Sequence, residues 1–427
     1  MRFDHLEQWL DWQSSIHDKA IDLGLDRVRE VADRLDINKI ADKVITVAGT
    51  NGKGSTVAMY ETWLRNAGYQ VASYTSPHLL RYNERIKRNL SPVADTELCD
   101  AFESIEQARQ QTALTYFEYG TLAALYLMQK WQPDFAILEV GLGGRLDAVN
   151  IIDADLVHLT PISLDHQAWL GSDREQIGFE KAGVLRADQN VVVNDPMPPA
   201  TVRGRLKDLN CSALFNGPDF GIDECHDGQF NWECNGMLFE FSPVLPGTHQ
   251  VHNLAGVVAG LSFLFPLSEL SETELQRRFD GTRIPGRFET VESDFPGKLI
   301  IDVGHNQDAA KALAVNLKQL KDEKARVIVL LGMLEDKESD AFVAELESVV
   351  DVWWTLDLDC DRGLRASDLA ARIDSRVSVS AMFSSPREAF DHALSSLHNQ
   401  DIMLVTGSFF TVEGLILSIS DSDERIK

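Results

Sequence analysis

A glycine-rich turn near the N-terminus constrains the fold of this chain more than any other stretch. It follows an apolar run over residues 44–48 and reads Gly-Thr-Asn-Gly-Lys-Gly-Ser-Thr from residue 49 to residue 56. Glycines let successive backbone N–H groups converge on one anion, a lysine adds positive charge, and the hydroxyls are suited to Mg²⁺. We therefore predict a buried strand, a helix over residues 56–67, and between them a phosphate-binding loop that includes Gly49, Asn51, Gly52, Lys53, Gly54 and Ser55.

The spacing in this loop departs from the common nucleotide-binding pattern G-x-x-x-x-G-K-[ST]. Gly49 stands four rather than five residues before Lys53, and Gly54 follows the lysine. An ordinary glycine turn between a strand and a helix is the alternative, but it explains neither the lysine nor the paired hydroxyls. The sequence thus indicates a variant of the phosphate loop.

Length and charge limit the kinds of partner. A chain of 427 residues is long enough for two or three domains. Its formal net charge of −26 argues against nucleic acid and anionic membranes as partners. The five cysteines form no C-x-x-C pair, and the sequence contains neither an export signal nor an apolar run long enough to cross a membrane. We expect a cytoplasmic monomer that binds anionic substrates in a local basic pocket.

Apolar strands alternate with helical stretches along most of the chain. Further strands are expected at 69–75, 134–140 and 156–160, and helices at 95–111, 119–130 and 252–265. Residues 186–245 contain many turns and indicate a small β subregion. Four more strands, at 298–303, 325–331, 350–356 and 402–406, follow a Pro-Gly pair at 285–286. The predicted fold is α/β: a P-loop-type domain with a mostly parallel sheet (1–285), then a smaller Rossmann-like domain (286–427).

Polar residues follow three predicted strands of the first domain at or soon after their ends. These are Ser76, Glu139 and His166. Ligands bind outside the carboxyl ends of parallel strands, so this set is a candidate magnesium site. A lone histidine is more often just a hydrogen-bonded polar group, and the Gly-Leu-Gly-Gly run after Glu139 is also compatible with a structural turn. The three residues together favour metal binding.

Lys181 stands in the apolar-flanked segment Phe-Glu-Lys-Ala-Gly, residues 179–183. It is either half of an exposed Glu/Lys pair on a helix or a lysine close to bound metal. In the second case carbon dioxide can convert it to a carbamate, which replaces a cation by a carboxylate. Spacing alone does not choose between the two.

Two further segments have the composition of substrate-binding loops. The first contains Ser76-Pro77-His78 and continues through residues 81–86, and its basic, aromatic and hydroxyl groups could bind a planar, acidic substrate. The second, Thr115-Tyr116-Phe117-Glu118, offers an aromatic face and a carboxylate that could hydrogen-bond a heterocycle, although it also fits a helix start. In the second domain, Asp302 and His305 follow a buried strand and are candidates for a nucleotide contact. A capped helix start at Asn306 is compatible with that role. Arg287 is either a contact to phosphate or base, or a surface charge.

Taken together, these motifs resemble those of the folylpolyglutamate synthases of the Mur-ligase superfamily, especially the bifunctional bacterial branch that is also a dihydrofolate synthase. The motifs that carry the resemblance run in order from residue 49 to residue 306: GTNGKGS, TSPHL, EVGLGGRLDA, DH, FEKAG, GRFE and DVGHN. Departures are small: Val149 and Gln307 stand where the family commonly has threonine and proline. They leave substrate preference less defined than reaction type.

The resemblance implies a role for each matching position. ATP phosphates would bind at residues 52–55, with Asn253, Arg287 and Asp302 completing the nucleotide site. Magnesium, in two ions, would bind to Ser76, Glu139 and His166, with Lys181 as the carbamate. The pterin substrate would contact residues 115–118 and Leu146, Asp147 and Ala148. Lys53, Lys181 and His166 would be the catalytic residues, and a monovalent cation is a further candidate activator.

The reaction implied by the resemblance is ligation. ATP would activate a carboxylate as an acyl phosphate, and L-glutamate would attack it, first on dihydropteroate and then on reduced folates. A folylpolyglutamate synthase without the first activity, a muropeptide ligase of the same superfamily, and a nucleotide-switch NTPase are the alternatives. The muropeptide ligase is disfavoured because the phosphate loop begins at residue 49, which leaves no room for a uridine-nucleotide domain before it.

Overall fold

The computed structural model describes residues 2–17, 21–224, 228–291, 295–322, 324–360 and 362–426. The chain divides into two compact units. Unit 1 comprises residues 1–244 and 250–283, and unit 2 comprises residues 245–249 and 284–427.

Unit 1 is built on an eight-stranded sheet with the order β4-β3-β2-β5-β1-β6-β7-β8. The six strands from β2 to β8 in this order are parallel, and β3 runs antiparallel to β2 at one side. The central strands are mostly apolar and almost entirely buried because helices cover them, as expected for a parallel sheet. The bounds are β1 Lys43–Ala48, β2 Val71–Tyr74, β3 Ile86–Arg88, β4 Ser91–Pro92, β5 Phe135–Glu139, β6 Leu156–Leu159, β7 Asn190–Val193 and β8 Ser212–Phe215.

Helices pack on both faces of this sheet. On one face a large apolar core lies under α2 (Asp26–Arg34), α4 (Asp95–Arg109) and α5 (Tyr116–Trp131), beside α1 (Leu6–Ser15). A second core on that face lies under α7 (Arg174–Lys181) and α8 (Ala200–Asp208). Strand side chains alternate, so His158 points to the other face, where its ring meets Tyr60 of α3 (Lys53–Asn66).

The strand order brings the predicted polar residues together at one edge. After β1 the chain forms β2 and later β5, which inserts between β2 and β1. The next strand, β6, lies on the other side of β1, so β5, β1 and β6 are neighbours. In the pairing, Val47 lies opposite Glu139, and Ala48 lies opposite Leu159. The segments after these strands therefore begin at the same end of the sheet, at its topological switch point.

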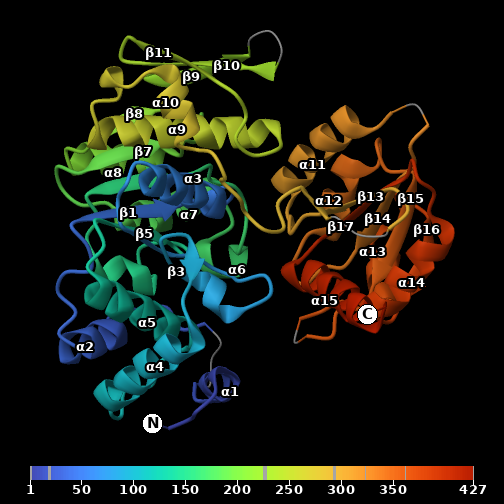
Figure 1. Cartoon of the computed structure of the whole chain (residues 1–427), viewed down its shortest axis with the longest axis horizontal. Helices are drawn as coiled ribbons and strands as arrows, with labels where there is room; N and C mark the ends of the chain where they lie inside the picture. The colour runs from blue at the N-terminus through green and yellow to red at the C-terminus, as the bar shows by residue number, and fades with distance from the viewer. Residues whose placement is uncertain are drawn as a thin grey trace. The chain divides into compact units, whose positions relative to one another are not determined.

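The prediction for residues 186–245 was only partly right. Two of its strands, β7 and β8, extend the main parallel sheet, and α8 connects them. The separate β structure is limited to the antiparallel strands β9 (Phe220–Glu224), β10 (Phe230–Cys234) and β11 (Met237–Phe241). Figure 1 shows this small sheet beside α9 (Thr248–Leu264) and α10 (Glu272–Arg277), and the indole of Trp232 donates a hydrogen bond to the Ala255 carbonyl of α9.

Unit 2 has a six-stranded sheet with the order β12-β13-β17-β14-β15-β16, in which only the edge strand β12 is antiparallel. Sequence analysis missed two of its strands, β12 (Glu289–Val291) and β16 (Val379–Phe383), which lie at the sheet edges and are partly exposed. The other elements are β13 (Lys298–Ile301), β14 (Val327–Leu331), β15 (Val352–Leu356), β17 (Ile402–Thr406), α11 (Gln307–Leu320), α12 (Ser339–Leu346), α13 (Ala366–Ile373), α14 (Pro386–Ser396) and α15 (Phe409–Ile426).

Among the described residues, no helix combines the length and the apolar character needed to cross a membrane.

Candidate active site

The phosphate loop joins β1 to α3. Helix α3 begins at Lys53, three residues earlier than predicted, because Gly52 adopts a left-handed conformation (φ +88°) as its N-cap. Lys53 is thus in the first turn, next to Gly54 and Ser55, and its Nζ donates to the Thr50 carbonyl at 3.1 Å. Backbone N–H groups at the start of a helix, with a lysine beside them, suit a phosphate group.

A polar network from α9 supports this loop. The Gln250 amide donates to the Ser55 Oγ at 3.1 Å, and the Asn253 amide donates to the Gln250 Oε1 at 3.0 Å. Asn253 also packs against Gly52, where a Cβ atom would lie only 2.7 Å from its Oδ1. Asn253 therefore belongs to unit 1 and adjoins the phosphate loop. Sequence analysis missed Gln250, since its contact with Ser55 spans 195 residues and no local pattern marks it.

Three of the predicted metal ligands lie at strand ends or in the segments that follow them in unit 1. Glu139 is the last residue of β5 and is buried, and its Oε2 accepts a hydrogen bond from the Ser76 backbone N–H at 3.2 Å. His166 is the N-cap of α6 (Gln167–Leu170), in the left-handed region with φ +51°, and Asp165 Oδ1 accepts its backbone N–H at 2.8 Å. Carboxylate, hydroxyl and imidazole groups on adjoining segments fit a magnesium or manganese site.

Within the described ranges, no three His, Cys, Asp or Glu side chains are grouped closely enough to bind a metal ion by themselves. The predicted ligand set contains only two residues of these types, Glu139 and His166, together with serine hydroxyls and a carbamate. The serine and lysine positions are therefore as important to the predicted site as the acidic one.

Lys181 is buried at the end of α7, which excludes the exposed Glu/Lys pair. Its Nζ donates to the Gly49 carbonyl at 2.6 Å, so the lysine lies directly behind the phosphate loop. Burial, followed by the nearby Lys53 charge, lowers the pKa of Lys181 to about 7. A large neutral fraction near neutral pH makes this amine a nucleophile for carbon dioxide.

The segment after β5 touches the end of α7. A Cβ atom at Gly144 would lie 2.7 Å from the Glu180 carbonyl oxygen, and the Arg145 N–H donates to that same oxygen at 2.8 Å. The glycine at this position therefore permits the close approach that fixes the helix end carrying Lys181.

Asp147 follows this turn, between Leu146 and Ala148, and is buried. Its carboxylate accepts backbone N–H groups of Leu142 at 2.8 Å and Val149 at 3.0 Å, yet burial raises its pKa to about 6. The Phe117 ring lies against Gly141 next to this carboxylate, and its centroid is 6.1 Å from that of Tyr74. An aromatic face beside a buried carboxylate is suited to a nitrogen heterocycle.

Thr115 and Glu118 form a capping box at the start of α5. Glu118 Oε2 accepts the Thr115 N–H at 2.8 Å, and Glu118 Oε1 accepts from Arg27 at 2.9 Å. The helix-start alternative is thus realised in the structure. A role of Glu118 and Tyr116 in binding substrate stays a prediction, and Arg27, which the sequence analysis did not consider, is part of this segment's support.

In unit 2, Asp302 follows β13 and is buried. Its carboxylate accepts the N–H groups of Phe288 at 2.8 Å and Gly304 at 2.7 Å. Burial raises its pKa, against the opposing charge of Arg287. His305 Nδ1 lies 3.0 Å from the Val303 carbonyl, and Asn306 caps α11, in line with its alternative interpretation. These residues form one turn, and their role with a nucleotide stays a prediction.

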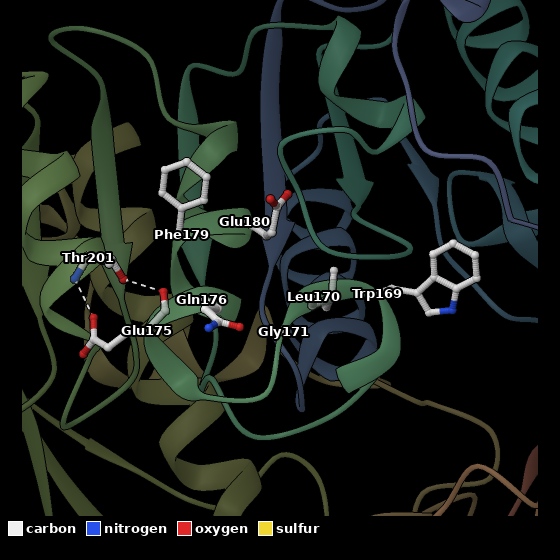
Figure 2. Close-up of a pocket in the computed structure, with 8 residues that line it drawn as sticks. All are labelled: Trp169, Leu170, Gly171, Glu175, Gln176, Phe179, Glu180 and Thr201. Atoms are coloured by element: carbon white, nitrogen blue, oxygen red, sulfur yellow. Dashed lines mark hydrogen bonds between the residues drawn. The ribbon is translucent and has the colours of Figure 1, made fainter.

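A separate hollow of about 440 Å³ lies along α6 and α7. Figure 2 shows Trp169 and Phe179 standing apart, with Leu170 and Gln176 between them. The acidic groups at this hollow are already occupied: Glu175 accepts the Thr201 N–H at 2.9 Å, and Glu180 accepts from Arg145 at 2.9 Å. None of the predicted ligands lines it.

Comparison with known proteins shows to which class of protein this chain belongs. Residues 47–261 match the model of the Mur ligase middle domain, and residues 286–409 match that of the Mur ligase glutamate ligase domain. Together with the phosphate loop and the two parallel sheets, these matches define a Mur-type ligase. The dihydrofolate synthase/folylpolyglutamate synthase of Escherichia coli is 41% identical over 410 residues, which cover 95% of this chain and 94% of that protein. The chain belongs to this dihydrofolate synthase/folylpolyglutamate synthase family.

Solved structures agree with this assignment. The structure of E. coli FolC in complex with DHPP and ADP aligns with a TM-score of 0.91 and 38% identity, covering 99% of both chains. The bifunctional enzyme of Yersinia pestis, complexed with AMPPNP and manganese, aligns with a TM-score of 0.89 and 38% identity, covering 98% of both chains. The predicted fold class and the resemblance to this family are confirmed.

Proposed function

We propose that this chain catalyses two ATP-dependent additions of L-glutamate. One converts dihydropteroate to dihydrofolate, and the other extends reduced folates through γ-linked glutamates. The observation that carries the proposal is the convergence, at the ends of β1, β2, β5 and β6, of a phosphate loop, candidate magnesium ligands and a buried lysine whose Nζ is 2.6 Å from the loop. The membership of the family supports it further.

The chemistry needs charge stabilisation at two steps. The substrate carboxylate attacks the γ-phosphorus of ATP, which releases ADP and leaves an acyl phosphate. The glutamate amine then attacks the acyl carbon and releases phosphate, so one ATP is consumed for each glutamate. Lys53 and the start of α3 hold the phosphates and stabilise the negative charge that develops in both steps. Lys181 as a carbamate adds a carboxylate behind the loop.

Ser76, Glu139, His166, Ser55 and the Lys181 carbamate would hold magnesium, in two ions, which would supply further positive charge against the phosphates. The aromatic face of Phe117, with Asp147 beside it, holds the pterin ring. Asn253 of α9 braces the loop, and Arg287, Asp302 and His305 are proposed as nucleotide contacts on the motif resemblance alone. A cytoplasmic location is part of the proposal, consistent with the thiols of Cys99, Cys211 and Cys234.

The test measures phosphate release with ATP, Mg²⁺ and L-glutamate, using dihydropteroate or tetrahydrofolate as acceptor, with products identified by mass. A gain of one glutamyl unit on both acceptors is expected. A gain on tetrahydrofolate alone would restrict the activity to polyglutamate synthesis. ATP hydrolysis at full rate without glutamate, and with no gain in mass, would refute ligation.

A further inference from the structure

Arg85 is a buried cation without an acidic partner among the described residues. It lies in the turn before β3, and the residue is 8% exposed. Two other buried charges of unit 1 have ion-pair partners: Glu61 with Lys87 at 3.0 Å and Asp195 with Arg174 at 2.7 Å. An arginine withdrawn from water without an anion is unfavourable, and such a group is a good receptor for a ligand's anion.

The immediate neighbours of Arg85 do not neutralise its charge. Its Nε donates to His78 Nδ1 at 2.8 Å, which requires His78 to be the acceptor and hence neutral. The guanidinium carbon lies 5.2 Å from the Tyr82 ring centroid and 5.6 Å from that of Tyr116, so aromatic faces flank the cation. Nε is used by His78, and the Tyr74 hydroxyl is a further neutral hydrogen-bond partner of the guanidinium. The two terminal nitrogens together carry four N–H groups, so some are left for a ligand.

This cluster is continuous with the proposed pterin site. The Tyr74 hydroxyl experiences the charges of both Arg85 and Asp147, and the Tyr74 ring adjoins Phe117. His78, Tyr116 and Phe117 are only half-buried, so the cluster has an edge open to solvent. A ligand lying on the rings of Tyr74 and Phe117 would therefore be close to both the Arg85 cation and the Asp147 carboxylate.

We propose that Arg85 binds a carboxylate of the pteroyl or folyl substrate while the ring system lies against the aromatic residues. The inference rests on the proposed function, because it assigns one more contact within the same substrate site. The carboxylate has two possible sources. Dihydropteroate carries only the carboxylate that reacts, whereas a folate also carries the α-carboxylate of its glutamyl group.

The test compares Arg85→Met with the wild type and measures kcat and KM for each acceptor. Methionine keeps an apolar side chain between the tyrosine rings and removes the charge. We expect KM for the acceptor to rise about 10- to 100-fold, the range for losing a charge-assisted hydrogen bond, while KM for ATP and for L-glutamate changes less than about 2-fold. Arg85→Lys, which keeps the charge, should recover part of the loss.

The matched control is Arg88→Met, three residues further along the chain in β3. Arg88 is exposed and stacks on Trp131 at 5.6 Å, so its loss should leave every KM unchanged. A second measurement uses the neutral carboxamide of dihydropteroate as an inhibitor. If Arg85 binds the reacting carboxylate, wild type should bind the carboxylate at least about 10-fold more tightly than the carboxamide, and Arg85→Met should not distinguish them.

The outcomes separate the two sources and the two proposals. A raised KM for both dihydropteroate and tetrahydrofolate assigns Arg85 to the reacting carboxylate, and a raised KM for tetrahydrofolate alone assigns it to the α-carboxylate. Unchanged KM values for both acceptors overturn the inference, and so does a raised KM for dihydropteroate with a carboxylate preference that survives in Arg85→Met. In either case an active wild type leaves the proposed function intact. A wild type that transfers no glutamate refutes the proposed function itself.

Discussion

The Lys53 side chain joins the phosphate loop to the chemistry of both proposed reactions. It is in the first turn of α3 and hydrogen-bonds the Thr50 carbonyl, which holds it over the loop. If one ATP site serves both additions, Lys53→Ala should lower kcat for dihydropteroate and for tetrahydrofolate alike, by about 100-fold or more. Survival of either activity in the variant would contradict a single shared site. Lys43→Ala, an exposed lysine at the start of β1, is the control.

Lys181 permits a more specific prediction. Its buried amine, with a pKa lowered to about 7, is poised to react with carbon dioxide. We expect Lys181→Ala to lose most activity, and formate or acetate to restore part of it, because a small carboxylate can occupy the space of the carbamate. Glutamyl transfer is measured with increasing formate, with Lys53→Ala as a variant that formate should not rescue. Full activity of Lys181→Ala without carboxylate would exclude the carbamate.

His158 is a buried titratable group whose effect is on stability. Burial lowers its pKa to about 3, and Tyr60 Oη lies 3.0 Å from its Nδ1. The pKa of a histidine in the unfolded chain is about 6.5. Below this pH the unfolded chain binds a proton at His158, and the native chain does not. As the pH falls from about 6.5 to 3, His158 should therefore lower the unfolding free energy of the wild type by up to about 1.4 kcal/mol for each pH unit. Above pH 7 this effect vanishes.

Urea unfolding of wild type and His158→Gln at pH 7, 6 and 5 checks this. As the pH falls, the unfolding free energy of the wild type should decrease more than that of His158→Gln. Tyr60→Phe is the control, because it removes the hydrogen bond but leaves the buried imidazole, and so should keep the wild-type slope. Parallel pH profiles for wild type and His158→Gln would show that the ring is protonated in the native state.

At the scale of elements, the glycine turn after β5 and the end of α7 act as one unit. A side chain at Gly144 would meet the carbonyl oxygens of Glu180 and Lys181, at 2.7 and 3.0 Å. Gly144→Ala should therefore destabilise the protein by about 1–3 kcal/mol and lower activity further by displacing Lys181. Gly204→Ala, at an exposed position of α8 with no atom within 4 Å of its Cβ, should instead add about 0.5–1 kcal/mol. Thermal unfolding and kcat of both variants test this, and equal effects would refute it.

The same elements show what a sequence can predict. Strands β1, β5 and β6 are mostly apolar, and polar residues such as Thr50, Glu139 and Thr160 stand at or just after their ends, so both the sheet and its active edge were predictable. The start of α3 was placed three residues late because the left-handed Gly52 lets the helix begin within the glycine run. The support from Gln250 and the paired role of Gly144 arise from contacts across the fold, which local spacing does not reveal.

For the whole molecule, the order of alternating strands and helices predicted two α/β domains, but it did not predict the edge strands β12 and β16. β12 and β16 are short or only half-buried, so they lack the apolar pattern of central strands. Residues 190–215 contain prolines and polar turns, which hid the fact that β7 and β8 belong to the main sheet. Composition alone could therefore not separate this region from the antiparallel strands that follow.

The division into two units leads to a prediction about ligand binding. Each unit has its own apolar core, and the phosphate loop, Gln250 and Asn253 all belong to unit 1. A nucleotide that binds only the native state adds about 2.7 kcal/mol at 100 times its Kd. We therefore expect AMPPNP with Mg²⁺ to slow amide hydrogen exchange most strongly in residues 47–60 and 248–256. Lys53→Ala should lose this protection, whereas Arg88→Met should keep it. Protection confined to residues 284–427 would place the primary nucleotide contacts in unit 2, and would contradict phosphate binding by the loop after β1.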